Sequence, residues 1–175
     1  MLSVTKRKEY LEYIGCKDVK SFQKKYMRSK DVDGKYGPST DKALQSVYNI
    51  LRYGDGFFNP SEFKCKCGGK YCTGYPAVVS VQLIKNLAFL RKDSGKPITI
   101  QSGLRCKTWN KMQSGSATQS RHISGLAVDI YSSVLTNTKA QRTKLVKRWY
   151  SFKKAHYAYS DTSNMGRSVH LDVNK

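Results

Sequence analysis

The sequence predicts an α+β protein, because it contains segments with strand-like periodicity and segments with helix-like periodicity. Apolar residues alternate with polar or small ones in 126–131 and 169–173, a period of two that is typical of half-buried strands. In 78–91 and 138–154 they recur at helical spacing. The 175 residues leave room for a small module and a domain of about 120 residues, each able to bury a core.

Residues 1–51 are predicted to form a small helical domain. The apolar stripe of one helix consists of Val19, Phe22 and Tyr26. The pairs Asp33-Gly34 and Gly37-Pro38 favour turns, and Ser39 or Thr40 can cap the helix that follows.

Residues 52–60 combine glycine and proline without an apolar period, so they are predicted to be a linker. In the second domain, 61–175, the helix at 78–91 is expected to pack on a sheet, and the helix at 138–154 to be a basic surface helix. A strand through Ile98 and Ile100 is expected to end near Arg105. The helical residues expected to face the core are Val81, Leu83, Ile84, Leu87, Leu90, Leu145, Val146 and Trp149.

His122, Asp129 and His170 form a pattern typical of zinc ligands. Two imidazoles and one carboxylate give Zn²⁺ three protein ligands and leave a fourth position for water, as in catalytic sites. Asp129 projects from one predicted strand, and the alternation in 169–173 places His170 and Asp172 on one face of another. Two adjacent strands are therefore expected to hold the metal, and the site indicates a hydrolase.

Three motifs carry a resemblance to a known family. They are Ser120-x-His122-x-x-Gly125-x-Ala127-x-Asp129, His170-x-Asp172, and Ser102-Gly103-Leu104-Arg105 followed by Asn110. Together they resemble the D-Ala-D-Ala carboxypeptidase family of zinc metallopeptidases, in the larger group shared with lysostaphin and the hedgehog signalling domain. The resemblance covers residues 56–175. It implies a small antiparallel sheet with flanking helices and zinc bound by His122, Asp129 and His170.

The same resemblance implies that Arg105 grips the substrate carboxylate or polarises the scissile carbonyl. The guanidinium suits this role because it is always charged and presents a planar fork to carboxylate oxygens. The general base is open, because many members of the group have a Glu three residues, or a His two residues, before the last zinc ligand. This chain has Arg167 and Ser168 there.

Three residues are candidates for the missing proton-transfer group. Asp172 comes first, because a residue two positions along a strand from His170 faces the same side. Asp161, in the polar loop 160–164, is the second, and His156 is the third, as a transition-state donor. Each can equally serve to orient a ligand imidazole.

The N-terminal third carries a second resemblance. Val19-x-x-Phe22-Gln23, the string from Asp33 to Thr40, and Ala43-Leu44 resemble the peptidoglycan-binding domain type 1. That resemblance implies a small three-helix module that binds the cell wall. The alternative is a helical fragment with no ligand.

The five cysteines are unevenly distributed along the chain. Cys65, Cys67 and Cys72 fall within eight residues, Cys106 directly follows Arg105, and Cys16 stands apart. Four thiolates suit a structural zinc site, although the spacing is not the common Cys-x-x-Cys pair. A disulfide from Cys106 to one of the other three, and free thiols, are the alternatives.

The formal net charge of +20 favours polyanionic partners. Nucleic acid is one such class, but the chain has no recognised nucleic-acid motif, and its twelve tyrosines are scattered. Cell walls that carry teichoic acids are polyanions too. We therefore expect peptidoglycan, with teichoic acids, as the partner of a monomer, and no specific nucleic acid.

The chain has no apolar run long enough to span a membrane, and its start lacks the apolar core of a signal peptide. These features resemble a bacteriophage endolysin, held in the host cytoplasm until lysis and acting then on the wall. We predict a zinc-dependent carboxypeptidase or endopeptidase that cleaves an amide in a peptidoglycan stem peptide or cross-link. The alternatives are a non-catalytic, zinc-containing wall-binding protein and a basic nucleic-acid-binding protein.

Overall fold

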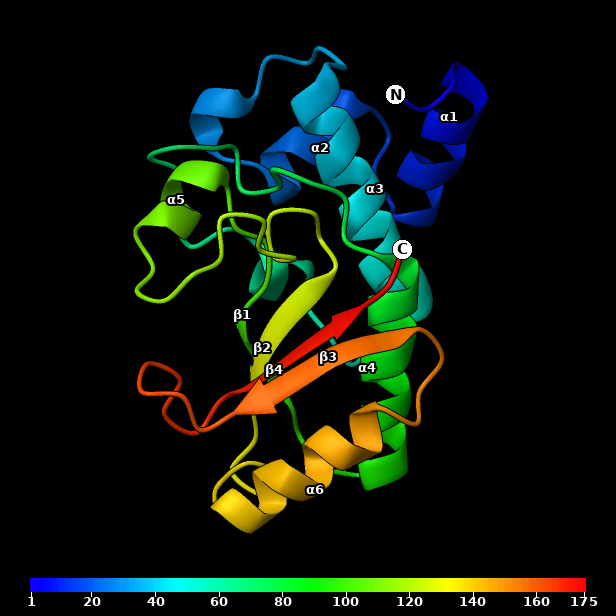
Figure 1. Ribbon diagram of the computed structural model, residues 1–175. Coiled ribbons are helices and arrows are strands. Elements are labelled where there is room, and N and C mark those ends of the chain that lie inside the picture. Colours follow the sequence, from blue (N-terminus) through cyan, green and yellow to red (C-terminus); the bar gives the residue numbers. More distant parts are fainter.

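The computed structural model describes residues 1–175 and has the predicted α+β architecture, with helices around one small sheet (Figure 1). The α-helices are α1 (Val4–Tyr13), α2 (Val19–Tyr26), α3 (Pro38–Tyr53), α4 (Val81–Ser94), α5 (Lys107–Lys111) and α6 (Lys139–Trp149). The strands are β1 (Thr99–Ser102), β2 (Ala127–Tyr131), β3 (Ala155–Ser160) and β4 (Val169–Val173), and two short 3-10 helices are η1 (Ser29–Asp31) and η2 (Pro60–Phe63). None of the helices has the length and apolar character needed to cross a bilayer.

The sheet has the strand order β1-β2-β4-β3, and all neighbouring strands are antiparallel. β2 and β4 lie side by side at its centre, with Asp129 directly opposite His170. The two strands predicted to carry the metal ligands are therefore neighbours. A register shift between Ile100 and Ser102 bends the end of β1, where the chain turns toward Arg105.

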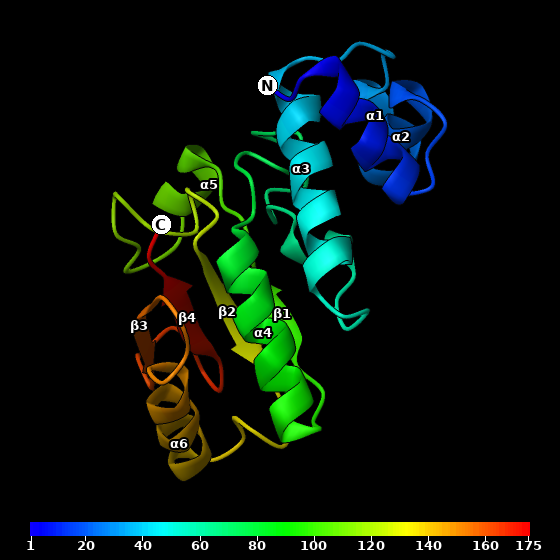
Figure 2. The same ribbon diagram turned by 90° about the vertical axis from the view of Figure 1, so that its right-hand side faces the viewer.

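The two faces of the sheet have different chemistry. Figure 2 shows α4 lying along one side of the sheet, and the buried Leu87 of α4, Trp149 of α6 and Leu171 of β4 belong to one apolar core. The side chains of Asp129 and His170 line a polar cleft instead. The period of two in β4 thus separates the core from the cleft.

The N-terminal helices share the core of the rest of the chain. One cluster of 30 buried residues includes Phe22 and Val47 from the first 51 residues together with Leu83 from α4. Polar contacts reinforce this packing: the Asn49 side chain donates to the carbonyl of Val79 at 2.8 Å. Figure 1 shows α3 passing directly from the N-terminal helices toward α4.

Some element boundaries differ from the sequence prediction. The helix expected at 78–91 begins only at Val81, because the Ser80 side chain caps it. The helix expected at 138–154 ends at Trp149, and β3 follows it as a strand that was not predicted. β3 is an edge strand in which only Ala158 is buried, so its apolar period is weak. Within the predicted linker, 52–60, α3 continues to Tyr53, and both Phe58 and Pro60 are buried.

Candidate metal centre and its cleft

Three elements position the predicted metal ligands. Asp129 and His170 sit on β2 and β4, and His122 lies in the loop that leads into β2. Gly125 shapes this loop, with φ of +74° and no room for a Cβ atom beside the carbonyl of Val78. The loop therefore packs closely enough to bring His122 beside the two strand residues.

The three donor atoms form a compact triangle. His122 Nε2 lies 3.3 Å from His170 Nδ1 and 3.3 Å from Asp129 Oδ1, and His170 Nδ1 lies 2.9 Å from Asp129 Oδ1. Zinc bonds of 2.0–2.1 Å in a tetrahedral site give ligand–ligand distances of about 3.3 Å. The side chains are also held in place, since those of His122 and His170 are 2% and 7% exposed. The arrangement therefore fits a three-ligand zinc site.

Hydrogen bonds set the proton positions on the two imidazoles. His122 Nδ1 lies 2.7 Å from the carbonyl of Gly103, and His170 Nε2 lies 3.2 Å from Asp172 Oδ2. Because a carbonyl and an ionised carboxylate can only accept, these two nitrogens must donate. In its neutral form, each ring therefore has its lone pair on the atom that faces the candidate metal position, which is Nε2 in His122 and Nδ1 in His170.

The electrostatic environment favours the charged form of Asp129 and the neutral form of His122. Burial opposes ionisation of Asp129, but hydrogen bonds from His122 and His170 hold the pKa of this carboxyl well below its usual value. Burial lowers the pKa of His122. Burial also acts to lower the pKa of His170, but hydrogen bonds to Asp129 and Asp172 outweigh it and raise the value. Of the two imidazoles, His170 therefore has the greater tendency to carry a proton that metal binding would displace.

Arg105 lies in the cleft next to the metal ligands. Its Nη2 donates to Asp129 Oδ2 at 2.5 Å, and its Nε donates to Ser102 Oγ at 3.0 Å. The preceding turn is tight, since a Cβ on Gly103 would meet the backbone of Phe63. Arg105 therefore holds the outer oxygen of Asp129, and its Nη1 makes no hydrogen bond within the chain.

Asp172 lies behind His170, on the side away from the donor-atom triangle. Besides His170, its carboxylate accepts from His156 Nδ1 and from the backbone N–H of Tyr157, both at 2.9 Å. Arg121 Nε lies 3.7 Å from it. Burial opposes ionisation, but the hydrogen bonds from His170 and His156 lower the pKa of Asp172. The structure thus places the first candidate for the base in contact with the distal nitrogen of a ligand.

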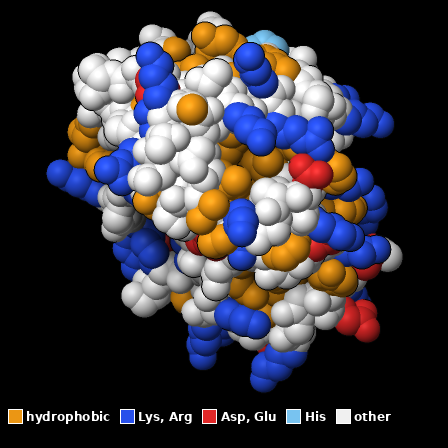
Figure 3. Space-filling model, turned by 90° about the horizontal axis from the view of Figure 1, so that it is seen from below, with side chains coloured by type: hydrophobic (Ala, Val, Ile, Leu, Met, Phe, Trp, Pro, Cys, Tyr) orange, Lys and Arg blue, Asp and Glu red, His pale blue; other side chains and the backbone are white.

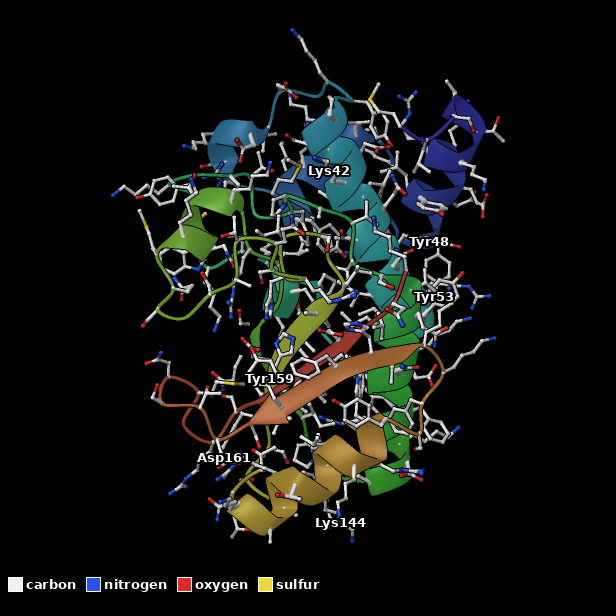
Figure 4. The ribbon with its side chains drawn as sticks, viewed as in Figure 1. Lys42, Tyr48, Tyr53, Lys144, Tyr159 and Asp161 are labelled. Carbon is white, nitrogen blue, oxygen red and sulfur yellow. The ribbon has the colours of Figure 1, made fainter.

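Asp161 is separate from the donor-atom triangle. It follows the last residue of β3 and faces α6, where its carboxylate pairs with Arg142 (Figure 4). The Arg142 and Ser160 side chains lower the pKa of Asp161 to about 2. Asp161 is not among the residues that line the cleft, so the structure does not bring it together with the other site residues.

The donor-atom triangle opens into a cleft of about 890 Å³. Only 4 of its 23 lining residues are hydrophobic, so the cleft suits a polar, extended ligand. Tyr159 of β3 lines it and stacks on His170, with 4.6 Å between ring centroids (Figure 4). Tyr157 and Tyr159 were not predicted to lie at the site, because β3 was not predicted. The sequence offered only a weak signal there, since Ala158 is the one buried residue of the strand.

The four clustered cysteines form a second group of metal-binding character. The Sγ atoms of Cys65, Cys67, Cys72 and Cys106 all lie within 4.8 Å of one another. No disulfide joins any of the five cysteines, and Cys16 lies apart in the main core. One member of the cluster, Cys106, directly follows Arg105, which lines the cleft.

Comparison with known proteins agrees with the geometry of the ligand triangle. The sequence model of the family described as Peptidase M15 matches residues 57–172, which include all three candidate metal ligands and Arg105. Neither the curated proteins nor the solved structures yield a significant match.

Proposed function

The chain belongs to the peptidase M15 family, and on this premise we propose that it hydrolyses an amide bond in the stem peptide or cross-link of peptidoglycan. One observation carries the proposal. Three donor atoms lie 2.9–3.3 Å from one another, close to the separation of ligands around zinc, at the edge of a polar cleft that contains Arg105. His122, Asp129 and His170 would hold the ion. Bound there, zinc supplies Lewis-acid chemistry that activates water and polarises a carbonyl.

Arg105 is proposed to bind the substrate. Its Nη2 donates to Asp129, and its Nη1 N–H groups are free to donate to a peptide carboxylate or carbonyl in the cleft. Tyr159 is a second candidate for this task, because its phenol borders the cleft while its ring packs on His170. Burial raises the pKa of Tyr159, which keeps its hydroxyl protonated and able to donate.

We propose His156 as the proton-transfer group, oriented by Asp172. The Asp172 carboxylate accepts from His156 Nδ1, so the ring proton is on Nδ1. Arg121 Nη2 lies 3.2 Å from His156 Nε2, and a guanidinium can only donate, so Nε2 carries a lone pair. His156 borders the cleft, and its side chain is 42% exposed. In this proposal Asp172 orients two imidazoles, and Asp161 has no part in the chemistry.

The charge of the molecule supports a wall substrate. Figure 3 shows Lys and Arg side chains distributed over the face seen there, with few acidic ones, in line with the net charge of +20. Stem-peptide carboxylates and teichoic-acid phosphates are anionic, so such a surface favours approach to the wall. Nucleic acid would be attracted in the same way, which is why a direct test must include it.

We further propose that the three N-terminal helices bind the wall. The motif that resembles a peptidoglycan-binding domain forms one ordered unit around Gln23, which is 1% exposed. The Gln23 amide donates to Asp33 at 2.9 Å and to the Lys35 carbonyl at 3.1 Å, and it accepts from the Gly34 N–H at 2.8 Å. These hydrogen bonds from the buried glutamine fix the conformation of the 33–37 loop. We also propose that the protein is a monomer and acts as an endolysin, which stays in the host cytoplasm until lysis.

The decisive test is the chemistry on intact walls. Purified full-length protein with added zinc is incubated with cell walls from several bacteria, and mass spectrometry identifies the released muropeptides. We expect new peptide ends from at least one wall, and none from the His122→Ala protein. His156→Ala should keep its zinc and lose about a hundredfold or more in activity, the usual scale for removal of a proton-transfer group. Asp161→Asn should remain active, because Asp161 lies outside the cleft.

Wall binding is tested separately with the inactive His122→Ala protein. Sedimentation with walls that persists in moderate salt, and that excess DNA does not abolish, would support the N-terminal proposal. Binding that vanishes in moderate salt and is equally strong on DNA would show attraction by charge alone and favour the nucleic-acid alternative. Wild-type protein that binds zinc and walls but releases no new peptide ends would favour the non-catalytic alternative.

A further inference from the structure

We infer that Cys65, Cys67, Cys72 and Cys106 bind one structural zinc ion, in addition to the ion at the His122 centre. A tetrahedral site with Zn–S bonds of about 2.3 Å has sulfur–sulfur distances of about 3.8 Å. The Sγ atoms of Cys67 and Cys72 are 3.6 Å apart, and all four lie within 4.8 Å of one another. Four thiolates would close the coordination sphere, which is typical of structural rather than catalytic zinc.

The backbone around the cluster is shaped for ligation. Gly68 and Gly69 both have positive φ, of 59° and 83°, and they turn the chain between Cys67 and Cys72. Backbone N–H groups point at two of the sulfurs: Cys106 N lies 3.3 Å from Cys65 Sγ, and Trp109 N lies 3.4 Å from Cys106 Sγ. Such N–H donors stabilise the negative charge of thiolate ligands.

Residues 65–72, which carry three of the cysteines, contribute no side chain to the main apolar core. Between η2 and α4 the chain forms no helix or strand, and its cysteines form a small cluster separate from the main core. Only the partly buried Tyr71 and Trp109 pack beside this cluster, together with Cys72. A bound metal ion supplies folding free energy to segments of this kind. Disulfides would require sulfurs about 2.05 Å apart, and the Cys67–Cys72 distance is far longer.

The proposed ion would connect three parts of the molecule. Cys106 directly follows Arg105, and its Sγ accepts the N-terminal hydrogen bond of α5. The Cys65 N–H donates to the Gly74 carbonyl at 2.8 Å and closes the loop. From the N-terminal helices, Arg28 donates to the carbonyl of Gly69 and is paired with Asp31 at 2.8 Å. The cysteine site would therefore anchor the backbone of Arg105 and the contact with the N-terminal region.

The test measures metal and thiols in the full-length protein. Elemental analysis should find two zinc ions per wild-type chain, one in His122→Ala, and one in the double variant Cys65→Ser/Cys72→Ser. Cys16→Ser is the matched control, because Cys16 is buried but outside the cluster, and it should retain two. Zinc X-ray absorption of the His122→Ala protein should show a shell of sulfur at about 2.3 Å. This measurement does not depend on the cysteine variants folding, and none of these readouts depends on peptidase activity.

Specific results would overturn the inference. Five reactive thiols in the unfolded, unreduced protein, with no metal left in His122→Ala, would mean that the cysteines are free. Three or one reactive thiols would demonstrate disulfides. Iron in place of zinc in His122→Ala would contradict the identity of the ion, since tetrahedral sulfur sites also accept iron.

Discussion

Replacing Asp172 with asparagine separates the two roles that a carboxylate beside His170 can have. The Asp172 carboxylate accepts from His156 and Tyr157 through Oδ1 and from His170 through Oδ2. An asparagine of the same shape keeps the first two bonds only if its oxygen takes the Oδ1 position. Its NH₂ group then faces His170 Nε2 as a donor, which requires the ring proton to move to Nδ1. Nδ1 is the atom that faces the metal position, so Asp172→Asn opposes metal binding.

The expected size of the effect follows from this displacement of one proton. Loss of a hydrogen-bonding partner to a metal-bound histidine typically reduces metal affinity 10- to 100-fold. That range equals about 1.4–2.7 kcal/mol in the free energy of zinc binding. When the asparagine oxygen takes the Oδ1 position, it still accepts from His156 Nδ1. Activity at saturating zinc should therefore fall only a few-fold.

The assay combines zinc competition with activity on wall peptides. A chromophoric chelator competes for zinc with the wild-type, Asp172→Asn and His122→Ala proteins, and the last of these identifies any zinc bound elsewhere. Hydrolysis is then measured over a range of free zinc concentrations. Unchanged zinc affinity together with a loss of about a hundredfold at saturating zinc would refute the reasoning, because that loss is typical of a missing general base. Asp172 would then be the base itself.

Two further predictions concern the scaffold of the site. Gly125→Ala should lower the free energy of unfolding by at least about 2 kcal/mol and weaken zinc binding, because the residue has positive φ and its Cβ would meet the Val78 carbonyl. Gly15→Ala is the control: Gly15 also has positive φ, of +72°, but its Cβ would meet no other atom, so this variant measures the backbone strain alone. An equal loss of stability in both variants would contradict the proposed clash. Trp149→Phe should lower the melting temperature by about 2–8 °C, because it removes the 2.9 Å bond from the fully buried indole to the carbonyl of Asp172. Trp109→Phe, at a partly buried site, should change it less, and equal shifts would mean that this hydrogen bond contributes little.

The candidate metal ligands could be predicted from sequence because their chemistry is local. Two histidines and an aspartate are zinc-ligand types, and the alternation in 169–173 places His170 on the polar face of a strand. The α+β class followed from the same periodicities. β3 was missed because an edge strand with one buried residue has almost no apolar period, so the position of Tyr159 beside His170 was missed with it.

The sequence alone determined which residues have metal-binding chemistry, because residue type and spacing are properties of the chain. Tertiary structure decided which atoms of those residues face one another. Asp172 and His170 are two residues apart on one strand, yet the carboxylate contacts the distal nitrogen because β3 brings His156 and Tyr157 to its other oxygen. Asp161 likewise forms an ion pair with Arg142 of α6 and does not line the cleft. Hydrogen-bond partners that come from distant segments depend on how the elements pack, and no local pattern in the sequence encodes them.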